Sequence, residues 1–336
     1  MEALSQLCQQ TFGHAPLHIA PLTPSGSPRA YSRLTLPGGN TLIGVIGTDP
    51  AENDAFWEMT TAFCAQGLPV PQVYARTPDH LRYLQQDLGP LSLYDYLAPA
   101  RAQGGAYAPH HERALRLTME RLATLQMRGA REQVFNHCYP IRRMDEESVW
   151  FDLNYFKYCF LRLTGIPFNE CRLQDDFRRL AQQLLHIEEP LLAFQYRDFQ
   201  ARNVMLPTPD DPHFIDYQGG RQGPVHYDVA SFLFQASAHY SPALRQRLLS
   251  AYLQALQHFT PVDPTRFHQQ LPPFVLFRTL QTLGAYGLRG LYERKPHFLS
   301  SLPHAIRQLS ECLAPTDDYP TLAALAQRLT QWQPST

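Results

Sequence analysis

The stretch Tyr196–Asn203 contains two polar side chains that could act on a hydroxyl proton and a divalent cation. Asp198 carries a carboxylate that can orient a hydroxyl group and accept its proton, and Asn203 follows with an amide oxygen. A second carboxylate, Asp216, ends the short apolar segment Phe214-Ile215. Hard cations such as Mg²⁺ prefer carboxylate and amide oxygens as ligands. The three side chains therefore have the chemistry that phosphoryl transfer needs, since that reaction depends mainly on positioning and charge.

The spacing of these residues is that of a kinase catalytic loop, H-R-D-x-x-x-x-N, with a metal-binding aspartate after it. Asp198 is accordingly predicted to be the catalytic base, and Asn203 and Asp216 are predicted to hold Mg²⁺. Tyr196 stands where histidine is usual, and Arg197 is expected to support the loop structurally. The loop pattern alone could arise by chance. A hairpin predicted between the two metal ligands strengthens the interpretation, because it would bring both side chains to one place.

Two kinds of sequence pattern surround this loop. In residues 1–90, short strand-like runs are separated by turn residues. This pattern predicts strands at 17–22, 30–36, 42–46, 73–76 and 81–86 and one helix at 51–66. Later residues show helical periodicity at 112–127, 145–163, 176–187, 229–239 and 242–259, with the hairpin at 204–206 and 213–216. We expect an α+β fold of the two-lobed, protein-kinase-like type. Its small β-rich N-lobe would span residues 1–88 and its larger, mostly helical C-lobe residues 89–336, with a ligand cleft between the lobes.

Several stretches carry a resemblance to a known family. They are Gly67-Leu68-Pro69-Val70-Pro71, Gln86-Asp87-Leu88-Gly89, Tyr196–Met205, Ile215-Asp216-Tyr217-Gln218, Gly223–Ser231, Leu280–Gly284, Lys295-Pro296 and Leu302-Pro303. Over nearly its whole length the chain resembles the aminoglycoside phosphotransferase (APH)-type kinase superfamily. The last three stretches resemble most the anomeric kinases of N-acetylmuramate and N-acetylglucosamine from cell-wall recycling. The resemblance implies ATP as phosphate donor, and implies that Asp228 braces the catalytic loop; Asp228 could also cap a helix starting at Val229.

The chain departs from the usual kinase pattern in its basic residues. Kinases of this fold place a lysine on the third strand to contact the α- and β-phosphates, but only Lys157 and Lys295 are lysine here, and neither lies in residues 1–90. Arginine also suits phosphate oxygens, so we predict that Arg29 or Arg33 takes this role. The alternative is that both are solvated strand residues. A helix glutamate, Glu52 or Glu58, could hold the arginine, and the sequence does not choose between them.

Other nucleotide contacts are predicted by position. Ser25, Gly26 and Ser27 form a polar loop between two predicted strands and are expected to approach the phosphates, although they do not match G-x-G-x-x-G. Gln86 and Leu88 lie at the expected lobe junction, where backbone groups would meet the adenine ring.

The acceptor is predicted from charge and from the resemblance, which places its pocket in the helical lobe. Aminoglycosides are polycations, and kinases that bind them line this pocket with carboxylates. From Ser241 onward the basic residues outnumber the acidic ones: Arg245, Arg247, Arg266, Arg278, Arg289, Arg294, Lys295, Arg307 and Arg328 against Asp263, Glu293, Glu311, Asp317 and Asp318. A neutral or carboxylated amino sugar fits this balance better. Asp152 and Asn154, within the aromatic stretch 150–158, are candidate acceptor contacts, although the same stretch also fits a helix core.

Composition excludes several other classes of protein. Hydrophobic residues make up 44% of the chain and charged residues only 18%, with a net charge of -1, so we expect a packed core and neither nucleic acid nor a membrane as partner. No apolar stretch is long enough to span a bilayer, and the first residues do not have a signal-peptide pattern. Six scattered cysteines lack a CxxC pair. These features predict a cytoplasmic protein with buried, reduced thiols.

We therefore predict an ATP-dependent phosphotransferase that acts on an amino sugar, at the anomeric hydroxyl if the resemblance extends so far. An aminoglycoside-type or other small-molecule hydroxyl kinase is the alternative. The missing lysine raises a third possibility, a nucleotide-binding pseudokinase with a regulatory role. A protein kinase is disfavoured, because residues 217–228 are too short for a long activation loop and contain no A-P-E. The sequence leaves open the acceptor, the hydroxyl, the choice of ATP or GTP, and the oligomeric state.

Overall fold

The structure is a computed structural model that describes residues 1–23, 29–235 and 238–333. The chain forms two compact units, each made of segments that are not consecutive. Unit 1 comprises residues 1–98, 108–142 and 196–221, and unit 2 comprises residues 99–107, 143–195 and 222–336. The predicted lobe boundary after residue 88 stays a prediction. The predicted fold class is confirmed, because a small antiparallel sheet is joined to a larger helical part.

Unit 1 holds the sheet and the predicted catalytic loop. Its elements are α1 (Glu2–Phe12), β1 (His18–Pro21), β2 (Ala30–Thr35), β3 (Thr41–Ile46), α2 (Pro50–Cys64), β4 (Val73–Arg76), β5 (Arg82–Gln86), α3 (Leu93–Tyr96), α5 (Pro109–Gly129), α6 (Glu132–Phe135), the 3₁₀ turn η3 (Ala201–Asn203), β7 (Val204–Met205) and β8 (His213–Phe214). The strands predicted before residue 90 are all present, with ends that differ from the prediction by at most one residue.

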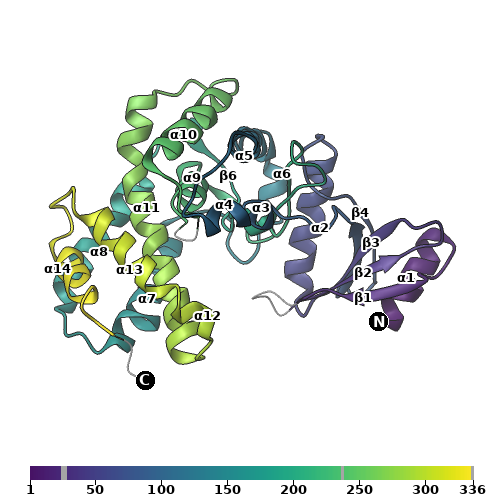
Figure 1. Cartoon of the computed structure of the whole chain (residues 1–336), viewed down its shortest axis with the longest axis horizontal. Helices are drawn as coiled ribbons and strands as arrows, with labels where there is room; N and C mark the ends of the chain where they lie inside the picture. The colour runs from purple at the N-terminus through teal and green to yellow at the C-terminus, as the bar shows by residue number, and fades with distance from the viewer. Residues whose placement is uncertain (24–28, 236–237, 334–336) are drawn as a thin grey trace. The chain divides into compact units, whose positions relative to one another are not determined.

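The five-stranded antiparallel sheet has the order β1-β2-β3-β5-β4, and the two helices of the first 64 residues lie on its opposite faces (Figure 1). Successive side chains of a strand point to opposite faces, so neighbouring residues serve different helices. Leu34 and Leu84 pack with Leu4 of α1 in one buried cluster. On the other face the ring of Tyr83 stacks on Phe56 of α2, with centroids 5.3 Å apart. This alternation fixes which face of the sheet α2 covers.

Helix α2 begins where the sequence supplies a strong start signal. The Asp49 side chain accepts a hydrogen bond from the Ala51 backbone N–H at 2.9 Å, and Pro50 occupies the first helical position. An acceptor at the N-cap satisfies a free backbone donor, and proline loses nothing there. The helix therefore starts at a defined residue, which fixes the position of Glu52 in its first turn.

The predicted hairpin after the catalytic loop is present as β7 and β8. Val204 pairs with Phe214 and Met205 with His213 in antiparallel register. Beyond this short ladder, the Ile215 backbone N–H donates to the Asn203 carbonyl at 3.0 Å. The backbone of Phe214 also donates to the Pro69 carbonyl at 2.8 Å. The hairpin is thus hydrogen-bonded both to the catalytic loop and to the segment that follows α2.

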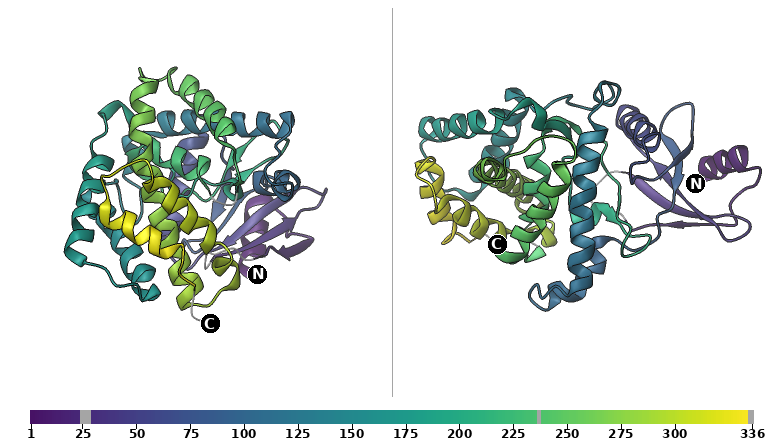
Figure 2. Two further views of the ribbon diagram at one scale, coloured as in Figure 1. Left: turned by 60° about the vertical axis from the view of Figure 1, so that its left-hand side comes forward. Right: turned by 90° about the horizontal axis from the view of Figure 1, so that it is seen from above.

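Unit 2 is mostly helical (Figure 2). Its elements are α4 (Ala98–Ala102), α7 (Glu146–Cys159), the 3₁₀ turns η1 (Leu161–Thr164) and η2 (Glu189–Leu191), α8 (Glu170–Leu185), β6 (Leu192–Gln195), β9 (Arg221–Pro224), α9 (His226–Leu233), α10 (Pro242–Leu256), α11 (Pro264–Tyr286), the π-helical turn η5 (Gly287–Tyr292), α12 (Pro296–Leu299), α13 (Leu302–Leu313) and α14 (Pro320–Leu329). The long helix α11 is its centre and packs against α7, α8, α9 and α13. Strands β6 and β9 form a separate two-stranded sheet.

Glycines allow the end of α11 to approach α7 closely. A Cβ atom at Gly287 would lie 2.0 Å from the Cys159 carbonyl oxygen, and one at Gly284 would lie 2.7 Å from the ring of Tyr155. No side chain fits at the first distance, because the neighbour is backbone and cannot move aside. The Leu280–Gly284 stretch of the sequence therefore has a packing reason in addition to its family resemblance.

No helix in the described part of the chain is long and apolar enough to cross a membrane. All six cysteines are free thiols. The expectation that they are buried is wrong for Cys171, which is exposed on α8, and holds fully only for Cys8.

Candidate active site

Asn203 brings the predicted catalytic groups together. Its amide nitrogen donates to the backbone carbonyl of Asp198 at 2.9 Å and lies 3.4 Å from the Asp216 carboxylate oxygen Oδ2. The 3₁₀ turn η3 ends at Asn203, which is buried, whereas the Asp198 side chain is exposed. The structure thus places the predicted base and the two predicted metal ligands at one position in unit 1.

Tyr196, in the place where kinases usually have histidine, ties the loop to the hairpin. Its hydroxyl donates to the backbone carbonyl of Ile215, the residue before Asp216. The ring is fully buried and meets Phe199, Phe214 and Tyr217 edge-on, with centroid distances of 5.2, 6.1 and 6.0 Å. Edge-to-face contacts of this kind favour a fixed ring orientation. Tyrosine is therefore compatible with an ordered catalytic loop.

The backbone is left-handed at two residues of this site. Arg197, directly before the predicted base, has a φ of 82°, and Asp216 has a φ of 66°. Such angles are uncommon for residues other than glycine and cost of order 1–3 kcal/mol when tertiary contacts hold them. Strained residues of this kind cluster at functional sites, so their presence beside both carboxylates fits an active site.

Asp216 lies in a crowded electrostatic environment. Although 36% of its side chain is exposed, loss of hydration raises the pKa of the Asp216 carboxyl, and the Asp198 carboxylate raises it further. Gln218, which donates to Oδ1 at 2.9 Å, and Arg29 act in the opposite direction. The net shift of the Asp216 pKa is upward, mainly because the carboxyl group loses hydration and in addition because two carboxylates repel one another. A cation between them would relieve this repulsion.

The donor set at this position fits a magnesium ion. The Asn203 nitrogen is engaged with the Asp198 carbonyl, so its amide oxygen is the atom with which it would bind the cation, beside the Asp216 carboxylate. Mg²⁺ in phosphoryl-transfer sites is bound by one or two protein oxygen groups and by substrate phosphates. The described residues contain no group of three or more His, Cys, Asp or Glu side chains that could form an all-protein metal cage. The residues therefore fit an ion that arrives with a nucleotide.

Arg29 is a basic residue that lies beside Asp216 in unit 1. Its guanidinium forms an ion pair with Glu52, and its Nη1 atom lies 3.6 Å from Asp216 Oδ1. Only 2% of the Arg29 side chain is exposed. Burial by itself lowers the pKa of Arg29, but Tyr31, Tyr83, Glu52 and Asp216 more than compensate and raise it. The arginine therefore stays charged at this position.

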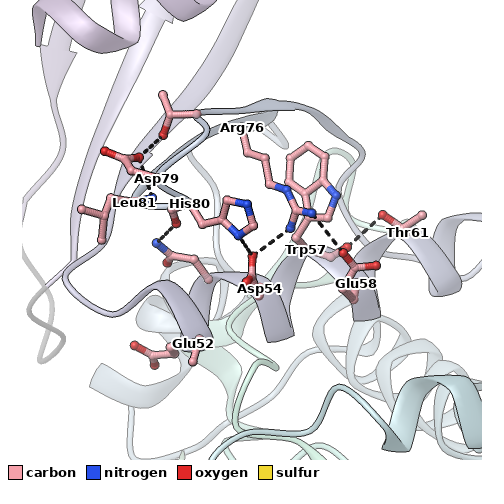
Figure 3. A network of polar contacts seen from close by, with 12 residues as sticks. Glu52, Asp54, Trp57, Glu58, Thr61, Arg76, Asp79, His80 and Leu81 are labelled. Atoms are coloured by element: carbon pink, nitrogen blue, oxygen red, sulfur yellow. Dashed lines mark hydrogen bonds and ion pairs between the residues drawn. The ribbon is translucent and has the colours of Figure 1, made fainter.

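Arg33 and Glu58 have other partners. Arg33 donates through Nε and Nη2 to the two carboxylate oxygens of Asp87, at 2.5 and 3.1 Å. Glu58 accepts a hydrogen bond from Arg76, which also binds Asp54 and lies over the Trp57 ring (Figure 3). Glu52 lies apart from this network on α2 (Figure 3). The open choice between Glu52 and Glu58 is thus decided by the structure, since Arg29 contacts Glu52.

The residue after Asp216 anchors α2. Tyr217 is fully buried, stacks on Phe56 with centroids 5.1 Å apart, and its hydroxyl lies 2.5 Å from that of Thr60. The prediction from the sequence did not include Tyr217, Thr60 or Gln218. Gln218 could have been suspected from its place two residues after a metal-binding aspartate, but nothing in the sequence pairs Thr60 with Tyr217.

The remaining predicted residues lie outside this cluster. Gln86 ends β5, and Leu88 is buried just after it, still in unit 1. Asp152, Asn154 and Asp228 lie in unit 2. The predicted phosphate loop, Ser25, Gly26 and Ser27, falls outside the described residues.

Two of these residues have roles in packing. Asp152 is buried and accepts a hydrogen bond from Gln281 of α11, so α7 is held to α11 there. Asp228 is fully buried in the first turn of α9, which begins at His226. The interpretation of Asp228 as an N-cap is therefore wrong, because the helix starts three residues earlier than its apolar pattern suggests.

Comparisons with known proteins agree with this geometry. The sequence model of the phosphotransferase enzyme family (APH) matches residues 27–265. An N-acetylmuramate/N-acetylglucosamine kinase of Pseudomonas aeruginosa is 24% identical over 325 residues, which cover 94% of this chain and 90% of that protein. A protein of the same name from Pseudomonas putida is 25% identical over 58% of this chain and 57% of its own length.

A solved structure shares the fold. The complex of the aminoglycoside phosphotransferase APH(2″)-IIIa with GDP and kanamycin superposes with a TM-score of 0.62 at 11% identity, covering 94% of this chain and 100% of that one. The family match includes Arg29, Asp198, Asn203 and Asp216. The chain therefore belongs to the phosphotransferase enzyme family and is an ATP-dependent kinase of this fold.

Proposed function

We propose that Asp198, Asn203, Asp216 and Arg29 form the phosphoryl-transfer site of this kinase. The observation that carries the proposal is the position of Asn203, within 3.4 Å of Asp216 and hydrogen-bonded to the backbone of Asp198. Asp198 orients the acceptor hydroxyl and accepts its proton while the hydroxyl oxygen forms a bond to the γ-phosphorus of ATP. The bond from that phosphorus to the β–γ bridging oxygen breaks, and ADP leaves. Asn203 and Asp216 would hold Mg²⁺, and the ion would supply positive charge to the phosphates.

Arg29 takes the place of the missing lysine in this proposal. Its buried guanidinium is held by Glu52 on one side and lies near Asp216 on the other, as expected for a group that contacts phosphates next to the metal. Arginine keeps its charge when buried and presents a planar fork of donors that matches phosphate oxygens. Arg33 then has a structural role, because both of its bonds are made to Asp87.

The acceptor we propose is an amino sugar, N-acetylmuramate or N-acetylglucosamine, phosphorylated at its anomeric hydroxyl. Two observations support it: a relative with that name aligns over 94% of the chain, and basic residues outnumber acidic ones after Ser241. A surplus of positive charge disfavours a polycationic acceptor.

The test is ATP consumption by the purified chain with a panel of acceptors. N-acetylmuramate and N-acetylglucosamine should be phosphorylated, and kanamycin should not. Phosphorus NMR of the product should show the coupling of a phosphate on the anomeric carbon. A phosphate on the 6-hydroxyl, or a preference for kanamycin, would refute the acceptor while leaving the kinase intact. Turnover that persists without any acceptor would measure hydrolysis only.

A further inference from the structure

Two cavities in unit 2 differ in how their charged residues are paired. One, of about 530 Å³, is lined by α8 and α14. Two of its arginines have partners within the chain, since Arg179 binds Asp176 and the Asp318 carbonyl, and Arg328 binds the Pro167 carbonyl. The other cavity, of about 540 Å³, is lined by residues of α9, α10, α11 and α13. We call it the Arg245 pocket.

Arg245 supplies a cation without a counterion at this pocket. In the described part of the chain no carboxylate lies within 4.0 Å of its guanidinium, and its buried Nε atom has no hydrogen-bond partner. Its guanidinium carbon lies 4.7 Å from the centroid of the Phe234 ring. Burial lowers the pKa of Arg245, and the more distant Glu311 only partly offsets this. A buried donor without a partner costs free energy, which a ligand acceptor would recover.

His268 supplies a second polar atom of the same kind. Its Nδ1 atom lies 2.6 Å from the Pro264 carbonyl oxygen, so this nitrogen carries the proton. The opposite ring nitrogen, Nε2, is buried, and among the described residues it has no hydrogen-bond partner. When the ring is protonated, Nε2 becomes a donor. Two unsatisfied groups from different helices, α10 and α11, thus line one cavity.

The rest of the lining is apolar on one part and basic on another. Leu249, Leu271 and Val275 provide hydrocarbon surface, and Arg307 adds a second guanidinium. Glu311 is the acidic residue among the lining residues. A ligand that suits this combination has a compact apolar body and one anionic head group.

We propose that the Arg245 pocket is a binding site for a small amphipathic organic anion, distinct from the site of phosphoryl transfer. All of its lining residues belong to unit 2, whereas Arg29, Asp198, Asn203 and Asp216 belong to unit 1. The head group accepts hydrogen bonds from Arg245 and, when the ring is an imidazolium, from His268 Nε2, and the apolar body covers the leucine and valine side chains. The proposal does not depend on the identity of the sugar acceptor.

The test uses anilinonaphthalene sulfonate, an aromatic sulfonate with fluorescence that rises in apolar surroundings, on the full chain. We expect one probe per chain to bind in the presence of saturating Mg·ATP and N-acetylmuramate. Arg245→Gln should weaken binding at least about tenfold, because a charge-assisted hydrogen bond is lost. His268→Asn, which can keep the bond to Pro264 but lacks Nε2, should weaken it by a smaller factor. Phenylnaphthylamine, which has the same rings without the charge, should bind Arg245→Gln and the wild type alike.

The matched control is Arg247→Gln, an exposed arginine on the same helix, which should leave probe affinity unchanged. Equal affinity in the wild type, Arg245→Gln and His268→Asn would overturn the proposal. Competitive displacement of the probe by N-acetylmuramate would overturn it too, because the pocket would then be the acceptor site. Thermal melting of each variant separates lost binding from lost folding. If Arg245→Gln does not fold, His268→Asn alone decides between the outcomes.

Discussion

At the scale of single residues, the site depends on how Asn203 divides its hydrogen bonds. Its amide nitrogen contacts the backbone of Asp198 rather than the carboxylate, so the loop geometry does not require the Asp198 side chain. Asp216, by contrast, is tied to Gln218 and lies near Arg29. The proposed base, Asp198, and the proposed metal ligand, Asp216, can therefore be perturbed separately.

Asp198→Asn should lower kcat by about 10²–10⁴-fold, because an amide cannot accept the acceptor's proton. Affinity for Mg·ATP should be nearly unchanged, since the backbone contact between Asp198 and Asn203 does not use the Asp198 side chain. Steady-state kinetics and calorimetric titration of Mg·ATP measure the two effects. Wild-type turnover in this variant would remove Asp198 from the mechanism.

Arg29→Ala should reduce kcat/KM for ATP by at least about tenfold, the effect of losing a charge-assisted contact. Arg29→Lys should restore part of this activity, because a point charge cannot make two parallel bonds to phosphate oxygens. Arg33→Ala is the matched control and should keep the kinetics. It should instead lower stability by about 1–3 kcal/mol, because Asp87, with 3% of its side chain exposed, loses its cation. Normal ATP kinetics in Arg29→Ala would place the phosphate clamp elsewhere.

At the scale of elements, α2 is joined to the segment after the predicted metal ligand Asp216 by one buried column of rings. Tyr83 of β5, Phe56 of α2 and Tyr217 stack in sequence, with centroid distances of 5.3 and 5.1 Å. The same helix carries Glu52, which holds Arg29. The position of α2 on the sheet therefore decides where the cation and Asp216 meet.

The hydroxyl pair of Thr60 and Tyr217 offers a test of this junction. Thr60→Val should destabilise the protein by about 1–3 kcal/mol, because the buried Tyr217 hydroxyl loses its partner. The double variant Thr60→Val/Tyr217→Phe should lower the free energy of unfolding by less than the sum of the losses in the two single variants, because neither hydroxyl is then left without its partner. Thr61→Val, exposed on the next position of the helix, is the control and should change stability by about 0.5 kcal/mol or less. Urea unfolding measures all four, and strict additivity would mean that the hydroxyls do not interact.

At the scale of the whole molecule, the helical unit buries an ionisable ring in its core. His226, at the start of α9, is fully buried and stacks on Phe267 and Phe274, with centroid distances of 4.0 and 5.2 Å. Loss of hydration lowers the pKa of His226 to about 3, and Glu188 offsets this only partly. The ring is neutral in the folded chain and must become charged when the chain unfolds in acid.

This burial makes stability dependent on pH. The unfolded chain binds a proton at His226 below pH ~6.5, and the folded chain does so only below pH ~3. The contribution of His226 to the free energy of unfolding is therefore full above pH ~6.5 and falls as the pH decreases towards ~3. The slope from this one group is at most ~1.4 kcal/mol per pH unit. The midpoint of thermal unfolding should therefore fall between pH 7.5 and 5 more steeply in the wild type than in His226→Phe, which keeps a stacked ring. Parallel curves for the two proteins would contradict the assignment.

The sequence alone was sufficient to predict features that depend on residues close together along the chain. Asp198, Asn203 and Asp216 could be predicted together, because a tight loop and a two-stranded hairpin are local structures with recognisable spacing. The strands of the first 90 residues and their order along the chain were predictable for the same reason. The absence of lysine from residues 1–90 was also evident from the sequence, because it follows from counting residues.

Only the tertiary structure decided which long-range partners meet. The alternation of side chains along the β2 segment puts Arg29 and Arg33 on the same face, so the sequence pattern alone treats the two arginines as equivalent. At about 3.3 Å per residue they are separated by ~13 Å along the strand. Arg29 therefore contacts Glu52, whereas Arg33 contacts Asp87. The contact of Tyr196 with Ile215, the start of α9 ahead of Asp228 and the unsatisfied atoms of Arg245 and His268 were likewise hidden. Each depends on strand register or helix packing, which are set by the burial of many residues at once and not by any short stretch of sequence.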